Sequence, residues 1–380
     1  MYFEWWHAIL KVTWDGRNLE FVSDELKNNK RVVTAAVTRY GRALEFASSQ
    51  LKNNERVATA AVTTTGRALE FASHELKNNV QIVTAAVTRD GSALKHASHE
   101  LKNNLQIVTA AVTQDGWALQ HASRELKNNV QIVTIAVTQR GTALHYASLE
   151  LKNNERVATI AMQRNGRALQ WASNELKNNV RVVTAAVTKN GEALKFASSR
   201  LKNNQRIVTI AVTHLGWTLE FASNRLKNNV TVMTAAVTWH GRALKFASNR
   251  LKNEKRIVAI AVARDGCALQ FASNNRKGDV GVVLTALRQN RLAWKHVSHQ
   301  DFIVAAVTRY RSTQSTQNTI STTLNAIDNS QKRTNLLNTF LHLYAVGLLL
   351  VDGFLLDAKA GIASLLICFK KQSVGLWYYN

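Results

Sequence analysis

One spacing constrains this chain more than any other feature: glycine recurs every 25 residues without insertion or deletion. The phrase LKNNERVATAAVTTTGRALEFASHE, residues 51–75, returns with few changes along the chain. Eleven of the seventeen glycines hold the same place in successive copies, at Gly16, Gly41, Gly66, Gly91, Gly116, Gly141, Gly166, Gly191, Gly216, Gly241 and Gly266. Such a period is typical of solenoids, whose units bury their apolar sides only against their neighbours.

The first half of each copy has the apolar pattern of a short helix. In the copy that begins at Asn29, Val32 and Val33 and the apolar pair four positions later form one stripe of a helix. Asn29 precedes this stripe as a predicted N-cap, and Asp279 holds the same slot in the last regular copy. We expect Gly41 to end the helix by adopting the left-handed conformation.

A second apolar stripe follows the glycine. Leu44, Ala47 and Leu51 lie at i, i+3 and i+7, Lys52 suits the negative end of a helix dipole, and Asn53 can form the turn. The sequence therefore predicts an all-α fold: an α-solenoid of eleven or so tandem 25-residue two-helix repeats, with a C-terminal apolar helical segment. Helices of about ten residues are unstable alone. Stacked at roughly 8–10 Å, eleven units would form a superhelix on the order of 100 Å long.

A strand-plus-helix repeat is the alternative, because phrases such as VVTAAVT are rich in β-branched residues and also alternate as a strand would. It would make a leucine-rich-repeat horseshoe. The leucine framework of those repeats is missing, however, and paired alanines are poor strand residues. The helical interpretation is favoured.

The repeated phrase, with Asn-Asn, Val-Val, Ala-Ala-Val, Gly, Ala-Leu, Phe-Ala-Ser and Glu-Leu-Lys in order, resembles the repeats of the domain of unknown function 4116 family over about residues 8–310. The resemblance implies a helical repeat and no established activity. The acidic residue usual before the first helix is mostly Asn here, as at Asn54 and Asn79, which keeps the cap and removes negative charge. The host-associated occurrence of the family implies a secreted effector that acts inside a host cell.

From residue 155 onward, successive copies also alternate. The first helix residue runs Glu155, Val180, Gln205, Val230, Lys255, and five positions on the series is Ile160, Ala185, Ile210, Ala235, Ile260. Duplication of 50-residue units, each made of two repeats, explains this alternation more simply than the alternative, in which each pair of repeats conserves the apolar volume along one groove.

The regular pattern decays after Gly266. We expect the solenoid to span residues 1–310 with degenerate capping copies at its end, a polar Ser/Thr/Gln/Asn-rich linker at 311–333, and an apolar helical hairpin or tail at 334–380. The apolar runs within 336–369 are shorter than the roughly 20 residues of a membrane span. A hairpin packed on the solenoid is therefore favoured over membrane insertion, which stays open.

The net charge of +24 favours acidic partners. It is lopsided, because residues 200–260 carry 11 Lys and Arg against 2 Asp and Glu. Two distant cysteines, Cys267 and Cys368, give no disulfide framework and favour a reducing, cytoplasmic compartment. The N-terminus lacks the pattern of a secretory signal peptide. We expect a monomer.

Function should lie in slots that vary between copies, and the turn between the two helices varies most. Basic and aromatic residues interleave there, at Trp14, Arg17, Arg39, Arg42, Arg67, Arg89, Trp117, Arg167, Trp217, Trp239, Arg242 and Arg264. This mixture suits phosphate contacts and base stacking. The favoured interpretation is nevertheless structural, with the indoles packed on neighbouring turns and the arginines forming a solvated rim.

Other recurring residues have structural explanations. The lysine series from Lys27 to Lys277 lies where helix C-termini favour cations. His96 and His121 share a slot with phenylalanine, which argues for packing and against a metal. The sequence contains no phosphate-cradling glycine loop, zinc-protease helix or nucleophile elbow, so we expect no enzyme activity and no cofactor.

Three hypotheses follow. The first is a non-enzymatic scaffold that binds an unidentified protein along its groove or rim. The second is a single-stranded nucleic-acid binder that uses the Arg and Trp turns, with phosphate affinity concentrated at residues 200–260. The third is a membrane-associated scaffold anchored through residues 336–369.

Overall fold

A computed structural model describes residues 2–298 of the chain, with side chains from residue 5. The chain divides into two compact units, Met1–Arg264 and Asp265–Asn380, and the second is described as far as residue 298. Residues 2–298 contain helices and no strand, which confirms the all-α solenoid and excludes the strand-plus-helix alternative there. No helix in this part is long and apolar enough to cross a membrane. The predicted linker 311–333 and tail 334–380 lie outside the described residues.

Each repeat contains a long α-helix, a six-residue 3-10 helix and a single helical turn. In the first unit the long helices are α1 (Tyr2–Trp14), α3 (Lys30–Arg39), α5 (Glu55–Thr64), α6 (Val80–Arg89), α7 (Leu105–Gln114), α8 (Val130–Gln139), α10 (Glu155–Arg164), α11 (Val180–Lys189), α13 (Gln205–His214), α15 (Val230–Trp239) and α17 (Lys255–Arg264). The six-residue 3-10 helices are η1 (Gly16–Phe21), η2 (Gly41–Phe46), η3 (Gly66–Phe71), η5 (Gly91–His96), η7 (Gly116–His121), η9 (Gly141–Tyr146), η10 (Gly166–Trp171), η12 (Gly191–Phe196), η13 (Gly216–Phe221) and η14 (Gly241–Phe246).

The single turns of the first unit are either α-helical or 3-10 helical. They are α2 (Asp24–Lys27), α4 (Ser49–Lys52), η4 (Leu76–Asn78), η6 (Leu101–Asn103), η8 (Leu126–Asn128), α9 (Leu149–Lys152), η11 (Leu176–Asn178), α12 (Ser199–Lys202), α14 (Asn224–Lys227) and α16 (Asn249–Lys252). The described part of the second unit contains η15 (Gly266–Phe271), α18 (Asn274–Lys277), α19 (Val280–Gln289) and η16 (Arg291–His296).

The long helices form as the sequence indicates. Asn29 Oδ1 accepts hydrogen bonds from the backbone N–H groups of Arg31 and Val32, at 3.0 and 3.3 Å, and Asp279 caps α19 in the same way. The predicted N-caps are therefore confirmed. Val32 and Val33 are fully buried, and the equivalent residues of the long helices from α5 to α17 are buried as well.

The predicted second helix is not continuous. After η2, Ala47 and Ser48 are extended, and only then does α4 begin. The extended conformation frees the Ser48 N–H to donate to the Lys27 carbonyl of the preceding repeat at 3.0 Å, and it lets the Ser48 hydroxyl cap α4. An inter-repeat hydrogen bond thus replaces helical hydrogen bonds that the apolar period alone would favour.

The glycines do not act as left-handed helix ends, so that expectation is wrong. At Gly41 and at nine equivalent glycines the backbone is not left-handed. A Cβ at Gly41 would instead lie 2.4 Å from the Ala61 carbonyl oxygen in the next long helix. Glycine is needed because consecutive repeats approach closely at this point.

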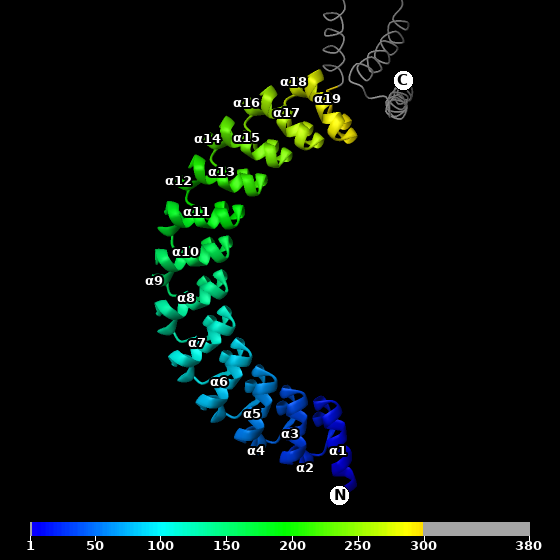
Figure 1. The fold of residues 1–380 in the computed structure, drawn as a ribbon, viewed down its shortest axis with the longest axis vertical. Coiled ribbons are helices and arrows are strands. Elements are labelled where there is room, and N and C mark those ends of the chain that lie inside the picture. Colours follow the sequence, from blue (N-terminus) through cyan, green and yellow to red (C-terminus); the bar gives the residue numbers. More distant parts are fainter. Residues whose placement is uncertain (1, 299–380) are drawn as a thin grey trace, which may run out of the picture. The chain divides into compact units, whose positions relative to one another are not determined.

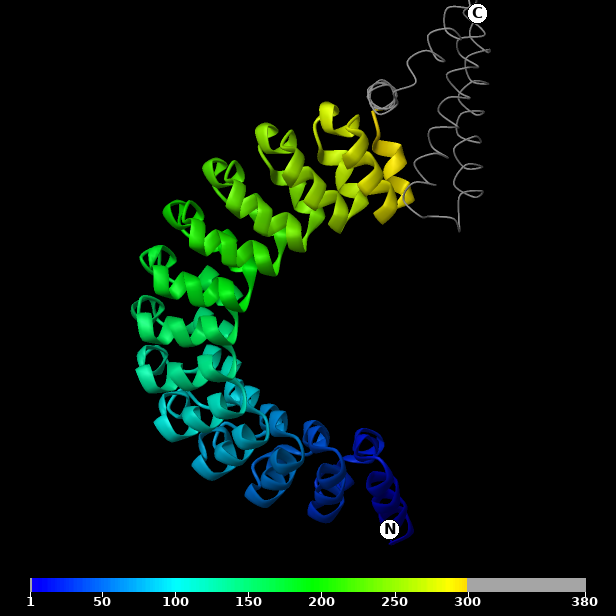
Figure 2. The ribbon, with the colours of Figure 1, turned by 45° about the horizontal axis from the view of Figure 1, so that its top comes forward.

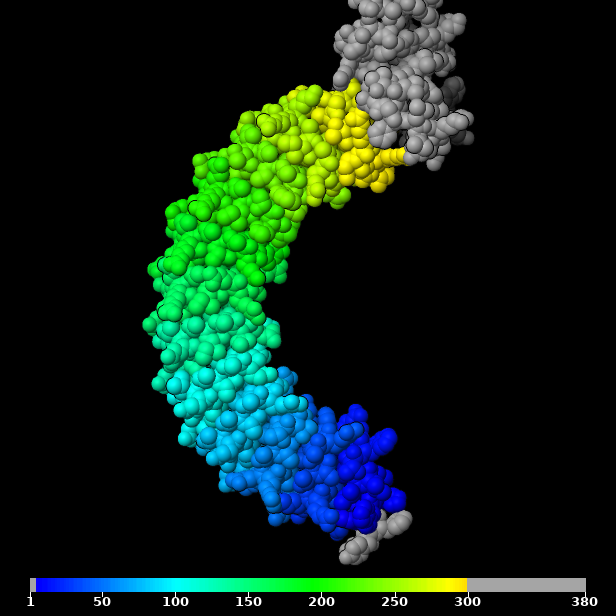
Figure 3. All heavy atoms as spheres, in the orientation of Figure 1, coloured from blue at the N-terminus to red at the C-terminus, as the bar shows by residue number. Residues whose placement is uncertain are grey.

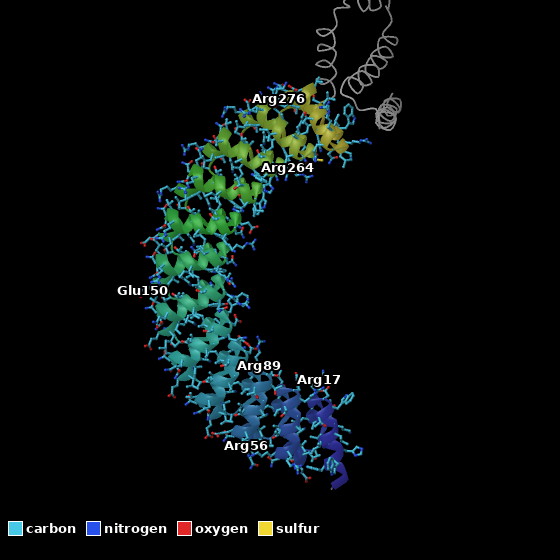
Figure 4. The ribbon with its side chains drawn as sticks, in the orientation of Figure 1. Arg17, Arg56, Arg89, Glu150, Arg264 and Arg276 are labelled. Carbon is cyan, nitrogen blue, oxygen red and sulfur yellow. The ribbon has the colours of Figure 1, made fainter. Side chains whose placement is uncertain are left out.

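In the first unit the repeats stack side by side into an arc, shown by Figure 1 and, after a turn, by Figure 2. The space-filling view shows the hollow that the arc encloses (Figure 3). Arg17, Arg89 and Arg264 lie on its inner side, whereas Arg56 and Glu150 lie on its outer side (Figure 4). We therefore call the turns between long helices and 3-10 helices the inner edge, and the single turns with the starts of the long helices the outer edge.

The polar members of the alternating series contact the next repeat along the outer edge. Glu155 Oε2 accepts a hydrogen bond from Nδ2 of Asn179, the N-cap one repeat later, at 3.1 Å, and Gln205 Oε1 accepts from Asn229 at 3.4 Å. These bonds link repeats in pairs, which gives the 50-residue alternation a physical basis.

Candidate functional site

The inner edge carries all the side chains that the sequence singles out for binding. They come from the last residue of a long helix or the second residue of the following 3-10 helix. All twelve are exposed: Trp14, Arg17, Arg39, Arg42, Arg67, Arg89, Trp117, Arg167, Trp217, Trp239, Arg242 and Arg264. The solenoid brings equivalent slots of neighbouring repeats together, and it separates the early members of this set from the late ones along the arc (Figure 4).

Several of the earlier arginines join one repeat to the next. Arg67 Nε donates to Ser92 Oγ at 2.7 Å and lies 2.9 Å from Asp90 Oδ2. Arg167 forms an ion pair with Glu192 of the following repeat. These guanidinium groups are already compensated by carboxylates, so they have little charge left for a ligand.

Trp117 also joins two repeats. Its indole Nε1 donates to Thr142 Oγ1 at 2.9 Å, and the Arg140 guanidinium lies over its ring at 4.6 Å from the centroid. Arg140 Nε in turn lies 2.8 Å from Asp115 Oδ1. This indole stacks on its neighbour, as the structural interpretation predicts.

The remaining early arginines differ in their surroundings. The Arg42 guanidinium lies 5.3 Å from the centroid of the Phe71 ring in the next repeat. The Arg17 guanidinium, bonded to Asp15, lowers the pKa of that carboxyl, and Arg39 adds to this at longer range. Within residues 5–298 the Arg89 guanidinium makes no hydrogen bond or ion pair.

The late turns have a different character. The Trp217 ring packs edge-on against Phe221 of its own repeat, and Trp239 is 56% exposed. Arg264 Nε donates to the Trp239 carbonyl at 3.2 Å, which holds the guanidinium beside the indole residue. None of the turns 214–217 and 239–242 contains Asp or Glu. In these late turns, exposed indoles therefore lie near cationic side chains, and the turns themselves contribute no acidic residue.

The outer edge contains a polar ladder that the sequence analysis did not recognise. Ser73 Oγ donates to Asn53 Oδ1 of the preceding repeat, and Asn53 Nδ2 donates to Glu75 Oε2 at 2.9 Å. The same Asn, Ser and Glu positions are linked as far as Asn153, Ser173 and Glu175. The strict recurrence of Asn-Asn and Ala-Ser was the signal that could have revealed it.

After Glu175, the side chain at the glutamate position of the ladder becomes positively charged. The next three repeats carry Arg200, Arg225 and Arg250 in the slot of the glutamate. Each guanidinium still bonds to the asparagine of the preceding repeat: Arg200 Nε donates to Asn178 Oδ1 at 2.8 Å, and its Nη2 donates to the Asn178 carbonyl at 2.6 Å.

Most of the late positive charge lies on this outer edge. Of the eleven lysines and arginines in residues 200–260, only Arg242 and Lys245 come from the segments that follow a long helix. The other nine belong to the single turns or the first turn of the next long helix, at Arg200, Lys202, Arg206, Arg225, Lys227, Arg250, Lys252, Lys255 and Arg256. The exposed tryptophans and the late basic cluster therefore occupy opposite edges.

The recurring lysines and histidines sit in half-buried positions. Burial lowers the pKa of the ammonium groups of Lys77, Lys102, Lys127, Lys152 and Lys202. Burial, followed by the Lys102 and Lys95 charges, lowers the pKa of the His121 imidazole to about 4. His96 Nε2 lies 4.0 Å from Glu70 Oε2. Within the described residues no group of three His, Cys, Asp or Glu side chains is arranged to hold a metal ion.

Comparison with known families identifies the family to which these repeats belong. A family model described as Domain of unknown function (DUF4116) matches residues 9–52, 54–102, 80–127, 104–152, 129–177, 154–202, 179–227, 204–252 and 229–277. Most of these segments span two repeats, and from residue 54 onward each begins about one repeat after the preceding one. No curated protein and no solved structure matches the chain. Because the matched segments cover well over half of the sequence, the chain belongs to the DUF4116 family and consists of its repeats in tandem.

Proposed function

We propose that the protein is a non-enzymatic helical-repeat scaffold that binds another protein along the inner edge of its first unit and needs no cofactor. The observation that carries the proposal is the exposed indole of Trp239, which lies beside Arg264 and one repeat after Trp217, a second and less exposed indole. Tryptophan and arginine are the residue types most enriched in binding hot spots, whereas scattered acidic residues are depleted there.

The comparison with Trp117 separates structural indoles from candidate binding indoles. Trp117 donates its N–H to Thr142 and stacks with Arg140, so its role in joining repeats accounts for its presence. Trp239 is more exposed than Trp117, at 56% against 44%. Its ring makes no hydrogen bond or ring contact within the described residues, so stability of the repeat array does not explain it.

A second candidate is single-stranded nucleic acid at the same edge, because exposed indoles provide stacking surfaces for bases. The distribution of charge favours protein over nucleic acid. Such ligands need a basic track beside the aromatics, and nine of the eleven late cations lie on the outer edge instead. A protein partner needs only the local aromatic and arginine contacts.

A photo-crosslinking amino acid placed at position 239 of the full chain tests the protein-binding proposal in cells. The control position is 149, because Leu149 is 84% exposed and belongs to α9 on the outer edge (Figure 1). We expect one defined protein adduct from position 239 that is absent from position 149 and is lost when Trp217 is replaced by alanine. The same adducts from both positions, or none from position 239, would overturn the proposal.

Titration with a labelled single-stranded RNA and DNA decides between the two candidates. Nucleic-acid binding through phosphates would weaken steeply with added salt, because binding releases counterions. If the full chain binds either strand tightly in this manner and Trp217→Ala with Trp239→Ala abolishes it, nucleic acid replaces protein as the ligand. Trp117→Ala is the matched control, and we expect it to reduce stability without changing binding.

A further inference from the structure

The outer edge of the late repeats holds three arginines in one repeated geometry. Arg225 Nε donates to Asn203 Oδ1 at 2.9 Å and its Nη2 to the Asn203 carbonyl at 3.1 Å. Arg250 makes the same two bonds to Asn228, both at 2.9 Å. With Arg200, these residues form a set that we call the anchored arginine row. Their single turns, α12, α14 and α16, lie along the outer edge in Figure 1.

The anchoring positions each charge without neutralising it. The acceptors are an amide oxygen and a backbone carbonyl, both of them uncharged, and these three guanidinium groups form no ion pair with a carboxylate within residues 5–298. One side of each guanidinium is held, and Nη1 makes no hydrogen bond in the described part of the chain. When an anion binds there, the arginine side chain loses less conformational entropy than a freely rotating arginine would.

Positive charge at this slot is not required by the fold. Glutamate occupies the equivalent position in six earlier repeats, and in five of them it accepts a hydrogen bond from the equivalent asparagine, as Glu175 does from Asn153 Nδ2 at 2.7 Å. Either side chain joins the repeats. The arginines therefore add a local property, a row of fixed positive charges, that stability of the solenoid does not demand.

The spacing of the row indicates the form of its ligand. Adjacent repeats stack at roughly 8–10 Å, so the three charges recur at about that interval. An extended or polyproline II segment advances about 3.1–3.3 Å per residue, and three residues span about 10 Å. In polyproline II every third side chain also returns to the same face. One carboxylate at every third residue would thus match one arginine in each repeat.

We propose that the anchored arginine row binds an acidic, extended polypeptide segment with Asp or Glu at every third position. This surface lies on the opposite edge from Trp217 and Trp239, so the inference is independent of the inner-edge proposal.

The observations favour a peptide over nucleic acid. The outer-edge segments 198–206, 223–231 and 248–256 contain no aromatic residue, so they offer no stacking surface for the bases of a single strand. A straight duplex returns the same strand to one face only once in about 34 Å, which is much longer than the interval between neighbouring arginines.

The experiment is a fluorescence-anisotropy titration of the full chain with a labelled peptide that carries glutamate at every third position. The test variant combines Arg200→Glu, Arg225→Glu and Arg250→Glu, which restores the side chain found in earlier repeats and should fold normally. The control combines Arg56→Glu, Arg124→Glu and Arg156→Glu, which makes the same change in net charge at three exposed arginines outside the row. We expect the test variant to bind about tenfold to a hundredfold more weakly, since each exposed charge pair contributes a factor of about two to five. The control should bind within about twofold of the wild type.

A gain of function provides a second measurement. Glu175 directly precedes Arg200 in the ladder, and Glu175→Arg should lengthen the row by one repeat. We expect this variant to bind a peptide with one further glutamate about two to five times more tightly than the wild type does.

Three outcomes would overturn the inference. The first is equal peptide binding by the wild type and the triple Arg→Glu variant. The second is equal weakening in the triple variant and in the charge-matched control, which would reduce the effect to net charge. The third is that the protein does not bind the peptide but binds a duplex or single-stranded RNA in a salt-sensitive way that requires the row. That result would identify phosphates as the ligand of the row.

Discussion

Replacing Gly91 with alanine tests whether the 25-residue glycine spacing exists for contact between repeats. A Cβ at this position would lie 2.4 Å from the Ala111 carbonyl oxygen in α7 and 3.0 Å from Gln114 Oε1. That carbonyl accepts the Asp115 N–H at 2.9 Å, so it cannot turn away without losing the hydrogen bond that ends the helix. An ordinary van der Waals separation would require a displacement of about 1 Å.

The expected cost follows from the kind of atom that obstructs the methyl group. Overpacking a well-packed interior costs about 1–3 kcal/mol, and flexible side chains account for the low end of that range because they can move aside. Here the obstacle is backbone, and the Gly91 N–H also donates to Gln114 Oε1 at 2.7 Å. We therefore expect Gly91→Ala to reduce the free energy of unfolding by about 3 kcal/mol.

Gly281 offers a matched control in α19. A Cβ there would meet only Asp279 Oδ1, at 3.4 Å, which is an ordinary contact. Because alanine has the higher helix propensity, Gly281→Ala should be neutral or stabilising by up to about 1 kcal/mol. Urea unfolding followed by circular dichroism measures both variants, and hydrogen exchange of η5 and α7 locates the loss, since repeat arrays can open locally. Wild-type stability and exchange in Gly91→Ala would refute the close-approach argument.

Two further predictions concern a helix cap and a histidine. Asn129→Ala removes the acceptor that Gln131 and Ile132 N–H groups use at 3.0 and 3.1 Å, and it should cost about 1 kcal/mol in urea unfolding, whereas Asn129→Asp should retain most of the stability. The folded-state pKa of His121, about 4, lies below its ordinary value of 6.5. Above 6.5 both states are neutral; between 6.5 and 4 the unfolded chain binds the proton first, so stability is lost as the pH falls. His121→Phe should reduce that loss, as urea midpoints measured at about pH 7 and about pH 5 would show, and an unchanged difference between the two midpoints would contradict the prediction.

Features that depend on neighbours in sequence could be predicted well. The cap at Asn29 and the buried pair Val32 and Val33 follow from local hydrogen bonding and helical periodicity, and both have the expected place in the structure. The all-α solenoid follows from the regular repetition of these local signals.

Features that depend on the distance between repeats could not be predicted in the same way. Gly41 looks like a helix end in sequence, but its need for glycine comes from a carbonyl twenty residues away. Leu44, Ala47 and Leu51 keep a helical period although Ala47 is extended, because burial requires only that their side chains face the core. At the candidate site, the Arg42 turn and the Arg67 turn share the phrase GRALEF, and only the partners that each arginine contacts distinguish them.

The outer-edge ladder shows how this solenoid can change its surface without changing its fold. An asparagine amide offers both a donor and an acceptor, so Asn153 can donate to Glu175 while Asn178 accepts from Arg200. The hydrogen bond between repeats survives in either case, and the sign of the exposed charge is free to vary. On the inner edge the partner of an arginine varies from turn to turn: Arg167 pairs with the Glu192 carboxylate of the next repeat, whereas Arg264 donates to the Trp239 carbonyl of the preceding repeat. Binding surfaces are therefore best sought where a side chain exposes charge or aromatic area that contacts between repeats do not require, at Trp239 on the inner edge and at the anchored arginine row on the outer edge.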